Sequence, residues 1–174
     1  MQPEKTLPIL VVVEDDAEVR ETITSSLLDV TATIVTAENG KQGLEKVLQL
    51  NPHAVLTDIS MPVMTGLEMI REIRKAGKET PIVVLSGFGD RNNTTEALRL
   101  GAMDFLHKPF DIDELNKVVN LSIALGIQMA DFQKAWEKYF ADNPELSGVS
   151  KDLLDKKREI FKMRLLSHPP RRND

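Results

Sequence analysis

The sequence predicts an α/β protein built on a parallel sheet. Short apolar runs recur along the chain, with stretches of helically spaced apolar residues between them, which is the pattern of successive βα units. The first and fourth runs are almost continuously apolar, as expected of strands that are covered on both faces. Five such units fit between residue 7 and about residue 126. We therefore expect a doubly wound sheet with helices on both faces.

Each expected element can be read from its apolar residues and its stop signals. The expected strands are Ile9–Val13, Ala32–Thr36, Ala54–Thr57, Ile82–Leu85 and Asp104–Leu106. The first three helices show helical spacing at Val19, Ile23 and Leu27; Leu44, Val47 and Leu48; and Leu67, Ile70 and Ile73. Turns and helix ends are marked by Asn39-Gly40, Gly77, Pro81 and Gly101.

The chain changes character after Phe110. Its apolar residues then follow alternating steps of three and four, which is the heptad spacing of a helical seam. The seam consists of Leu115, Val118, Ser122, Leu125, Met129, Phe132, Trp136 and Tyr139. Gly126 either lies inside one long helix, at a cost of about 1 kcal/mol relative to alanine, or ends it. We expect a domain over residues 1–126 and a helical extension over 127–174.

The extension is expected to hold one more helix. Asn143-Pro144 and Ser147-Gly148 predict a loop, and Ser150 is the expected N-cap of an amphipathic helix that runs to about Leu166. Residues from Pro169-Pro170 onward are expected to be disordered. From Lys151 the chain has eight Lys or Arg against four Asp or Glu, although the whole chain has a formal net charge of −5.

Composition excludes several classes of protein. The chain has no cysteine, which excludes disulfides, thiolate catalysis and Cys-ligated zinc. The acidic net charge argues against a protein that coats nucleic acid. The run Ile9–Val13 is too short for a signal peptide or a membrane span, so we expect a cytoplasmic protein. His53, His107 and His168 lie far apart without ligand spacing and are expected to bind no metal.

Chemically active side chains follow four of the expected strands. In a doubly wound sheet, ligands bind beyond the carboxyl ends of the strands. The residues at those ends are Glu14, Asp15, Asp16, Asp58, Ser86 and Lys108. Carboxylates drawn together repel one another unless a cation joins them, and Mg²⁺ takes carboxylates, waters and phosphate oxygens. Such a site suits phosphoryl transfer to an aspartate, with the lysine and the metal neutralising charge.

Taken singly, each of these residues has an ordinary explanation. The acids after the first strand could favour a helix N-terminus, Asp58 and Ser86 could be turn residues, and Lys108 could be a solvated surface lysine. These explanations give no reason for all of them to share one edge of a sheet. The combination therefore favours a site.

Four sequence runs resemble the receiver domain of bacterial response regulators. They are I-L-V-V-V-E-D-D, V-L-T-D-I-S-M-P-V-M-T-G-L-E, V-V-L-S-G-F-G-D-R and G-A-M-D-F-L-H-K-P-F. Each run is weak alone, but the four together, in this order and at this spacing, are specific. The resemblance covers residue 7 to about residue 126 and implies a flavodoxin-like sheet with strand order 2-1-3-4-5.

The resemblance implies a phosphoacceptor and a metal site. Asp58 would take a phosphoryl group from a sensor histidine kinase. Asp15, Asp58 and the main-chain carbonyl of Ser60 would bind Mg²⁺, and Glu14 would act through a bound water. Glutamate at position 14 is a mild departure, since aspartate is more common there in the family.

The resemblance also implies a phosphate-binding and switch group. Ser86 and Lys108 would contact phosphoryl oxygens, Phe105 would be the aromatic switch residue, and Lys108-Pro109 would be a cis peptide. We further expect bulky Phe88 to shield the acyl phosphate from water and to slow its hydrolysis.

Several outputs are open. The first is protein–protein contact, as a homodimer or on a downstream partner, through the seam residues Leu125, Met129, Phe132, Trp136 and Tyr139. The second is DNA binding, because Gly148-Val149-Ser150 faintly resembles a helix-turn-helix turn and the tail is basic. Pro144 breaks the region where the preceding helix should pack, so a nucleic-acid partner is disfavoured. A third is a phosphorelay intermediate.

An aspartate-nucleophile phosphatase is disfavoured, because such enzymes carry the nucleophile on the first strand. We therefore expect a switch rather than an enzyme, whose only catalytic acts are its own phosphorylation and dephosphorylation.

Overall fold

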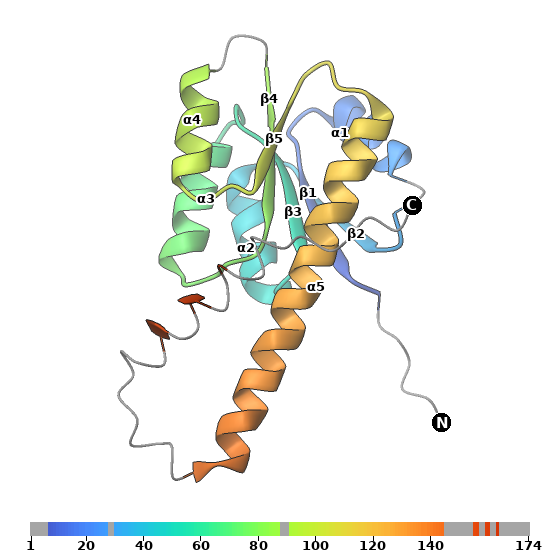
Figure 1. Cartoon of the computed structure of the whole chain (residues 1–174). Coiled ribbons are helices and arrows are strands. Elements are labelled where there is room, and N and C mark those ends of the chain that lie inside the picture. The colour runs from blue at the N-terminus through green and yellow to red at the C-terminus, as the bar shows by residue number, and fades with distance from the viewer. Residues whose placement is uncertain are drawn as a thin grey trace. The chain divides into compact units, whose positions relative to one another are not determined.

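Five parallel strands form one sheet in the order β2-β1-β3-β4-β5, which confirms the predicted fold (Figure 1). The computed structural model describes residues 7–27, 30–87, 91–144, 155–156, 159–160 and 163. The strands are β1 Ile9–Val13, β2 Thr33–Ala37, β3 Ala54–Asp58, β4 Ile82–Ser86 and β5 Asp104–His107. The helices are α1 Ala17–Ser26, α2 Gly40–Leu50, α3 Gly66–Lys75, α4 Arg91–Arg99 and α5 Ile112–Asp142. The chain divides into two compact units, Met1–Gly126 and Ile127–Asp174.

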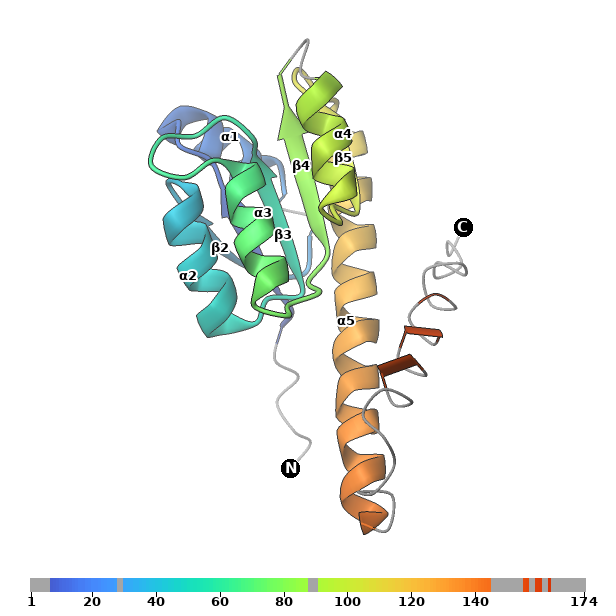
Figure 2. The same ribbon diagram turned by 90° about the vertical axis from the view of Figure 1, so that its left-hand side faces the viewer.

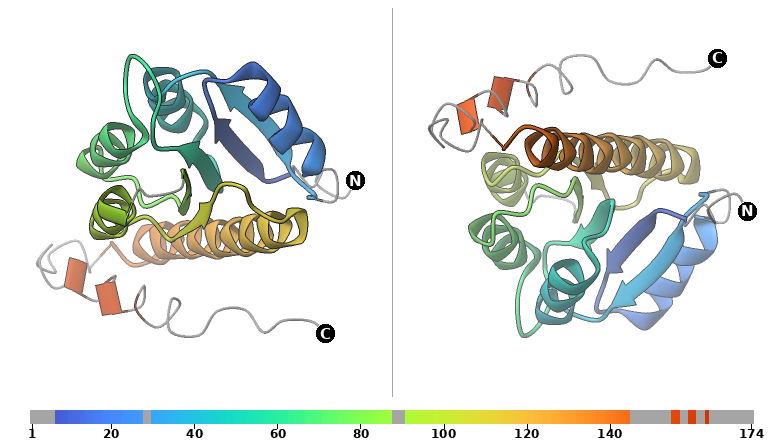
Figure 3. Two further views of the ribbon diagram at one scale, coloured as in Figure 1. Left: turned by 90° about the horizontal axis from the view of Figure 1, so that it is seen from above. Right: turned by 90° about the horizontal axis from the view of Figure 1, so that it is seen from below.

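Helices cover both faces of the sheet (Figure 2, Figure 3). On one face α2, α3 and α4 bury Val47, Ile70 and Ala97 against the strands. On the other face α1 and α5 bury Ile23 and Leu115. Alternate strand residues divide between the two cores, so every residue of β3 and β4 is buried. Burial of each large apolar side chain contributes about 1.5–3 kcal/mol, which accounts for the near-continuous apolar strands.

Polar residues and glycines fix the helix ends where the sequence places them. Asp16 accepts hydrogen bonds from two backbone amides at the start of α1, and Asn39 accepts one, from the Gln42 amide, at the start of α2. Thr65 forms a capping box at the start of α3. Gly77 and Gly101 follow α3 and α4 with φ of 72° and 88°, a backbone conformation that favours glycine.

Strands β2 to β5 each end one residue beyond the apolar run predicted for them, whereas β1 ends where predicted. Asp58 pairs with Leu85 in the β3–β4 ladder, and Ser86 pairs with His107 in the β4–β5 ladder. The apolar pattern stops at the last core residue, whereas the backbone ladder continues. The side chains of Asp58, Ser86 and His107 are therefore held by strands rather than by loops.

Helix α5 does not end at Gly126. A Cβ at this position would lie 1.7 Å from the His53 carbonyl oxygen and 2.6 Å from its carbonyl carbon. The His53 amide donates to the Ile9 carbonyl at 2.8 Å, and its Nδ1 accepts from the Ile9 amide at 3.1 Å. Glycine is needed here because the helix passes directly over a backbone segment that β1 holds in place.

The predicted heptad seam is not one continuous exposed stripe. Leu115 and Ser122 are 0% and 1% exposed within the first unit, where Leu115 packs in the sheet core. Leu125 is only 8% exposed, so little of its side chain is available at the predicted dimer or docking seam. The helical spacing there reflects packing on the domain's own sheet.

The second unit carries a cluster of aromatic side chains. Phe132 and Trp136 have ring centroids 5.6 Å apart, and Trp136 and Phe140 have centroids 5.2 Å apart. Tyr139 is 54% exposed and meets Phe140 edge-on at 5.7 Å. We call Phe132, Trp136, Tyr139 and Phe140 the aromatic cluster. The predicted seam lacked Phe140.

Arg74 connects three backbone carbonyls at the amino edge of the sheet. Its guanidinium donates to the carbonyls of Lys78, Thr80 and Gly101 at 2.9, 3.1 and 2.7 Å. Thr80 lies just before β4 and Gly101 just before β5. One side chain therefore joins the end of α3 to the starts of two strands.

Several predicted features lie outside the described residues. These are Phe88, the turn and cap at residues 145–150, His168 and the segment from Pro169-Pro170 onward. Of the predicted last helix, residues 155–156, 159–160 and 163 are described and are helical. Over the described part of the chain, no helix combines the length and apolar character that crossing a membrane requires.

Candidate functional site

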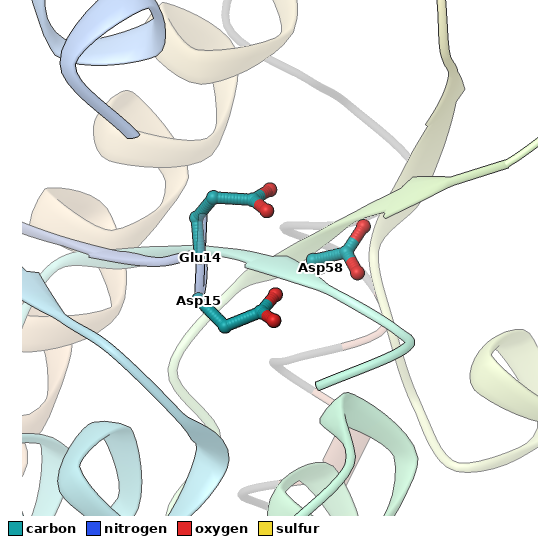
Figure 4. Close-up of side chains that lie close together, drawn as sticks. All are labelled: Glu14, Asp15 and Asp58. Atoms are coloured by element: carbon teal, nitrogen blue, oxygen red, sulfur yellow. The ribbon is translucent and has the colours of Figure 1, made fainter. Parts of the chain in front are cut away.

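Three carboxylates meet at the carboxyl edge of two neighbouring strands. Glu14 and Asp15 directly follow β1, and Asp58 is the last residue of β3. One carboxylate oxygen from each lies within 4.8 Å of the other two, and Figure 4 shows the three side chains close together. Glu14 and Asp58 are buried, at 3% and 7% exposed, whereas Asp15 is exposed. The predicted acidic site is thus assembled as expected.

Lys108 joins two of these carboxylates. Its Nζ lies 2.7 Å from Glu14 Oε2 and 2.8 Å from Asp58 Oδ1. Burial alone would lower the pKa of Lys108, but its hydrogen bonds to Asp58 and Glu14 outweigh burial and raise it. Burial raises the pKa of Glu14, although Lys108 opposes that shift. The lysine is therefore a charged group inside the acidic cluster at neutral pH.

Both oxygens of Asp58 have partners. Oδ1 contacts Lys108, and Oδ2 accepts from the Ser60 amide at 2.9 Å. The start of α3 packs on the same segment, since a Cβ at Gly66 would lie 2.1 Å from the Asp58 carbonyl oxygen. In the loop between them Val63 has a φ of 69°, an uncommon conformation for a β-branched residue. The Asp58 carboxylate is therefore held in one orientation.

The third acid after β1 has a different role from its neighbours. Asp16 caps α1 and does not join the acidic cluster. Arg20 Nη1 donates to the carbonyls of Glu14 and Asp15 at 2.7 and 3.3 Å. No pattern in the sequence pointed to Arg20, because this contact depends on how α1 folds back over the end of β1.

The donor set fits a hard divalent cation. Carboxylate oxygens are the ligands that Mg²⁺ takes in proteins, usually together with water and phosphate oxygens. One ammonium group cannot neutralise three carboxylates, so the cluster retains negative charge that a cation would compensate. The acidic pocket can therefore bind a metal ion.

Ser86 is the last residue of β4, the strand next to the one that ends at Asp58, and Phe105 lies on β5. Ser86 is fully buried, and its Oγ lies 2.7 Å from His107 Nδ1. Phe105 is partly buried against the α2–α4 core, and its ring meets the His107 ring edge-on at 5.0 Å. His107, which the sequence singled out only as a histidine expected to bind no metal, thus contacts both residues. The Lys108-Pro109 peptide is cis, as predicted.

Residues 10–120 match the family model of the response regulator receiver domain. The transcriptional regulatory protein TdiR of Thauera aromatica is 32% identical over 145 residues, which are 83% of this chain and 64% of that protein. The DNA-binding transcriptional regulator NtrC of Escherichia coli is 34% identical over 116 residues, 67% of this chain and 25% of that protein. The chain therefore spans less than two thirds of the length of these relatives.

A solved structure gives the same answer for the fold. The receiver domain of Francisella response regulator 1452 superposes with a TM-score of 0.62 at 30% identity, over 67% of this chain and 96% of that chain. Sequence match, strand order and acidic cluster agree with one another. The chain belongs to the response regulator receiver domain family of two-component signalling proteins.

Proposed function

We propose that this chain is a phosphorylation-controlled switch in which Asp58 accepts a phosphoryl group from a sensor histidine kinase. The observation that carries the proposal is the position of the Asp58 carboxylate. It ends a central strand, lies beside Glu14 and Asp15, and is held by Lys108 and the Ser60 amide. A carboxylate in such a setting is a suitable nucleophile for forming an acyl phosphate.

In the transfer, a carboxylate oxygen of Asp58 attacks the phosphorus atom of phosphohistidine. The new O–P bond forms as the P–N bond breaks, and the imidazole leaves with the bonding electron pair and takes up a proton. Lys108 neutralises charge on the phosphoryl oxygens, for which its raised pKa keeps it charged. Asp15, Asp58 and the Ser60 carbonyl are the residues that would hold Mg²⁺, with Glu14 acting through a water. When bound, this ion supplies further charge neutralisation.

Phosphorylation is proposed to shift a two-state equilibrium. The Ser86 hydroxyl turns toward a phosphoryl oxygen, and Phe105 moves into the space that Ser86 leaves. The change thereby spreads from the acidic edge to the face formed by α4, β5 and α5. The only catalytic acts we propose are phosphorylation and dephosphorylation of the protein itself, and we infer a cytoplasmic location.

Intact-mass measurement with a small phosphodonor tests the chemistry. With acetyl phosphate and Mg²⁺ the protein should gain one phosphoryl group on Asp58, and chelation of the metal should prevent this. Asp58→Asn should remove labelling. Asp16→Asn is the matched control, because asparagine caps a helix as well as aspartate does and Asp16 only caps α1. Unchanged labelling of Asp58→Asn would contradict the proposal.

We propose protein–protein contact, with self-association as its simplest form, as the output. The aromatic cluster supports it, since Trp136 and Tyr139 are residue types enriched at interfaces and Tyr139 is 54% exposed. Light scattering with and without beryllofluoride and Mg²⁺ should show a mass increase on activation. Trp136→Glu should abolish the increase, and Lys134→Glu, an exposed position on the same helix, should retain it. An increase that survives Trp136→Glu would exclude this surface.

DNA binding is the second candidate, because TdiR and NtrC are transcriptional regulators by name. The matched segments cover only part of those proteins, so the likeness to this chain does not include their full length. A gel-shift titration at several salt concentrations distinguishes the two outputs, since phosphate contacts make DNA affinity fall steeply with salt. Transfer of the phosphoryl group to a histidine phosphotransfer protein would instead identify a relay intermediate.

A further inference from the structure

The hydroxyl of Ser86 has a partner on the neighbouring strand. Ser86 and His107 are paired residues in the parallel β4–β5 ladder, so their side chains lie on the same face of the sheet. Ser86 is 0% exposed, and its Oγ lies 2.7 Å from His107 Nδ1. A buried hydroxyl that lacks a partner is costly, so this contact stabilises the orientation of Ser86 seen here.

A serine hydroxyl carries one proton. Phosphoryl oxygens only accept hydrogen bonds, so the Ser86 hydroxyl would have to donate its proton to bind one. If that proton is donated to His107 Nδ1, it is not available to a phosphoryl group on Asp58. The two hydrogen bonds therefore exclude each other, and the first must break when the second forms.

His107 also contacts the aromatic residue proposed to follow Ser86. The Phe105 and His107 rings meet edge-on with centroids 5.0 Å apart, and both residues belong to β5. Residues two apart in a strand project from the same face. Ser86, His107 and Phe105 therefore form one contiguous contact chain from β4 to β5.

From this geometry we propose that His107 is a positioning residue that holds the Ser86 hydroxyl in the unphosphorylated form. The hydroxyl donates to His107 Nδ1 at rest, and activation must break this bond before Ser86 can reach the phosphoryl group. His107 thereby sets how strongly the resting form is favoured. This inference rests on the proposed phosphorylation of Asp58 and adds the residue that opposes the switch.

The test is the affinity of the full chain for beryllofluoride with Mg²⁺, measured by ¹⁹F NMR of the bound fluorides. His107→Phe keeps a ring beside Phe105 but removes the acceptor. If the resting form predominates, the apparent dissociation constant should fall about fivefold, which corresponds to the loss of one ordinary hydrogen bond of about 1 kcal/mol. His107→Asn, whose amide oxygen can take the place of Nδ1, should retain the wild-type affinity.

A double-mutant cycle separates this role from a general structural effect. In a Ser86→Ala background, which has no hydroxyl to hold, His107→Phe should leave the affinity unchanged. An affinity that does not rise in His107→Phe, or that rises equally in the Ser86→Ala background, would overturn the inference. His107→Leu repeats the measurement if the Phe variant does not fold. Failure of the proposed function would give another result, because the wild-type chain itself would then show no signal from bound fluoride.

Discussion

Replacement of Gly126 by alanine should destabilise the fold, although helix preference alone would predict that it stabilises the fold. Inside a helix, alanine is favoured over glycine by about 1 kcal/mol. At Gly126, however, the new Cβ would lie 1.7 Å from the His53 carbonyl oxygen. A carbon–oxygen contact needs about 3.3 Å, so the helix or the strand must move by about 1.6 Å.

Neither side can move easily. The His53 backbone is tied to Ile9 through its amide and its ring, and α5 is tied to the sheet through buried Leu115 and Val119. Overpacking costs about 1–3 kcal/mol, and the upper end applies because the obstacle is backbone. After the gain in helix preference, Gly126→Ala should destabilise the fold by about 2 kcal/mol. Its melting temperature should fall by about 4–8 °C.

Urea unfolding followed by circular dichroism measures this difference. Asn120→Ala is the matched control, because Asn120 is an exposed residue of the same helix and should gain a few tenths of a kcal/mol. A Gly126→Ala variant as stable as the wild type or more so would refute the close approach of α5 to His53.

Three further predictions concern other sites. Val63→Asn should raise the free energy of unfolding in urea by about 1 kcal/mol, because Val63 is 78% exposed with a φ of 69° and asparagine tolerates that conformation. A lower free energy of unfolding in the variant would contradict this. Arg74→Met should lower the free energy of unfolding by about 2 kcal/mol in the same assay, since three carbonyls lose their hydrogen-bond donor. An unchanged urea midpoint would show that water replaces the guanidinium as donor. Burial raises the pKa of Glu14 in the folded state, so its stabilising contribution is present below the ordinary value of 4.5 and is lost as pH rises through the raised pKa. Wild type should therefore lose stability relative to Glu14→Gln as the pH rises above 4.5 in metal-free buffer, and a constant difference would exclude the shift.

Sequence reasoning located the site residues that follow from strand ends. Asp58 and Lys108 could be placed because apolar runs mark the strands, and parallel strands bring their carboxyl ends to one edge. The same reasoning could not separate Asp15 from Asp16, since both follow β1. That difference arises only when α1 begins and Asp16 turns to cap it.

Contacts between distant segments were beyond sequence reasoning. His107 acquires its partner through the register of β4 against β5, and Arg20 through the position of α1. The environment of the predicted seam on α5 could not be predicted from the sequence either. Helical spacing identified an apolar face, but it could not show that Leu125 would be only 8% exposed.

The three-way contact of Arg74 has a mechanical consequence. It pins the loops that lead into β4 and β5, while Ser86 and Lys108 lie at the opposite ends of these strands. Each of the two strands is therefore fixed near its amino end, whereas its carboxyl end lies at the site where phosphorylation would act. A displacement that begins at the acidic edge is expected to be largest there and to become smaller toward the amino ends of the strands, which Arg74 holds. The displacement would therefore reach the first turns of α4 and α5, which follow β4 and β5, rather than the amino edge of the sheet.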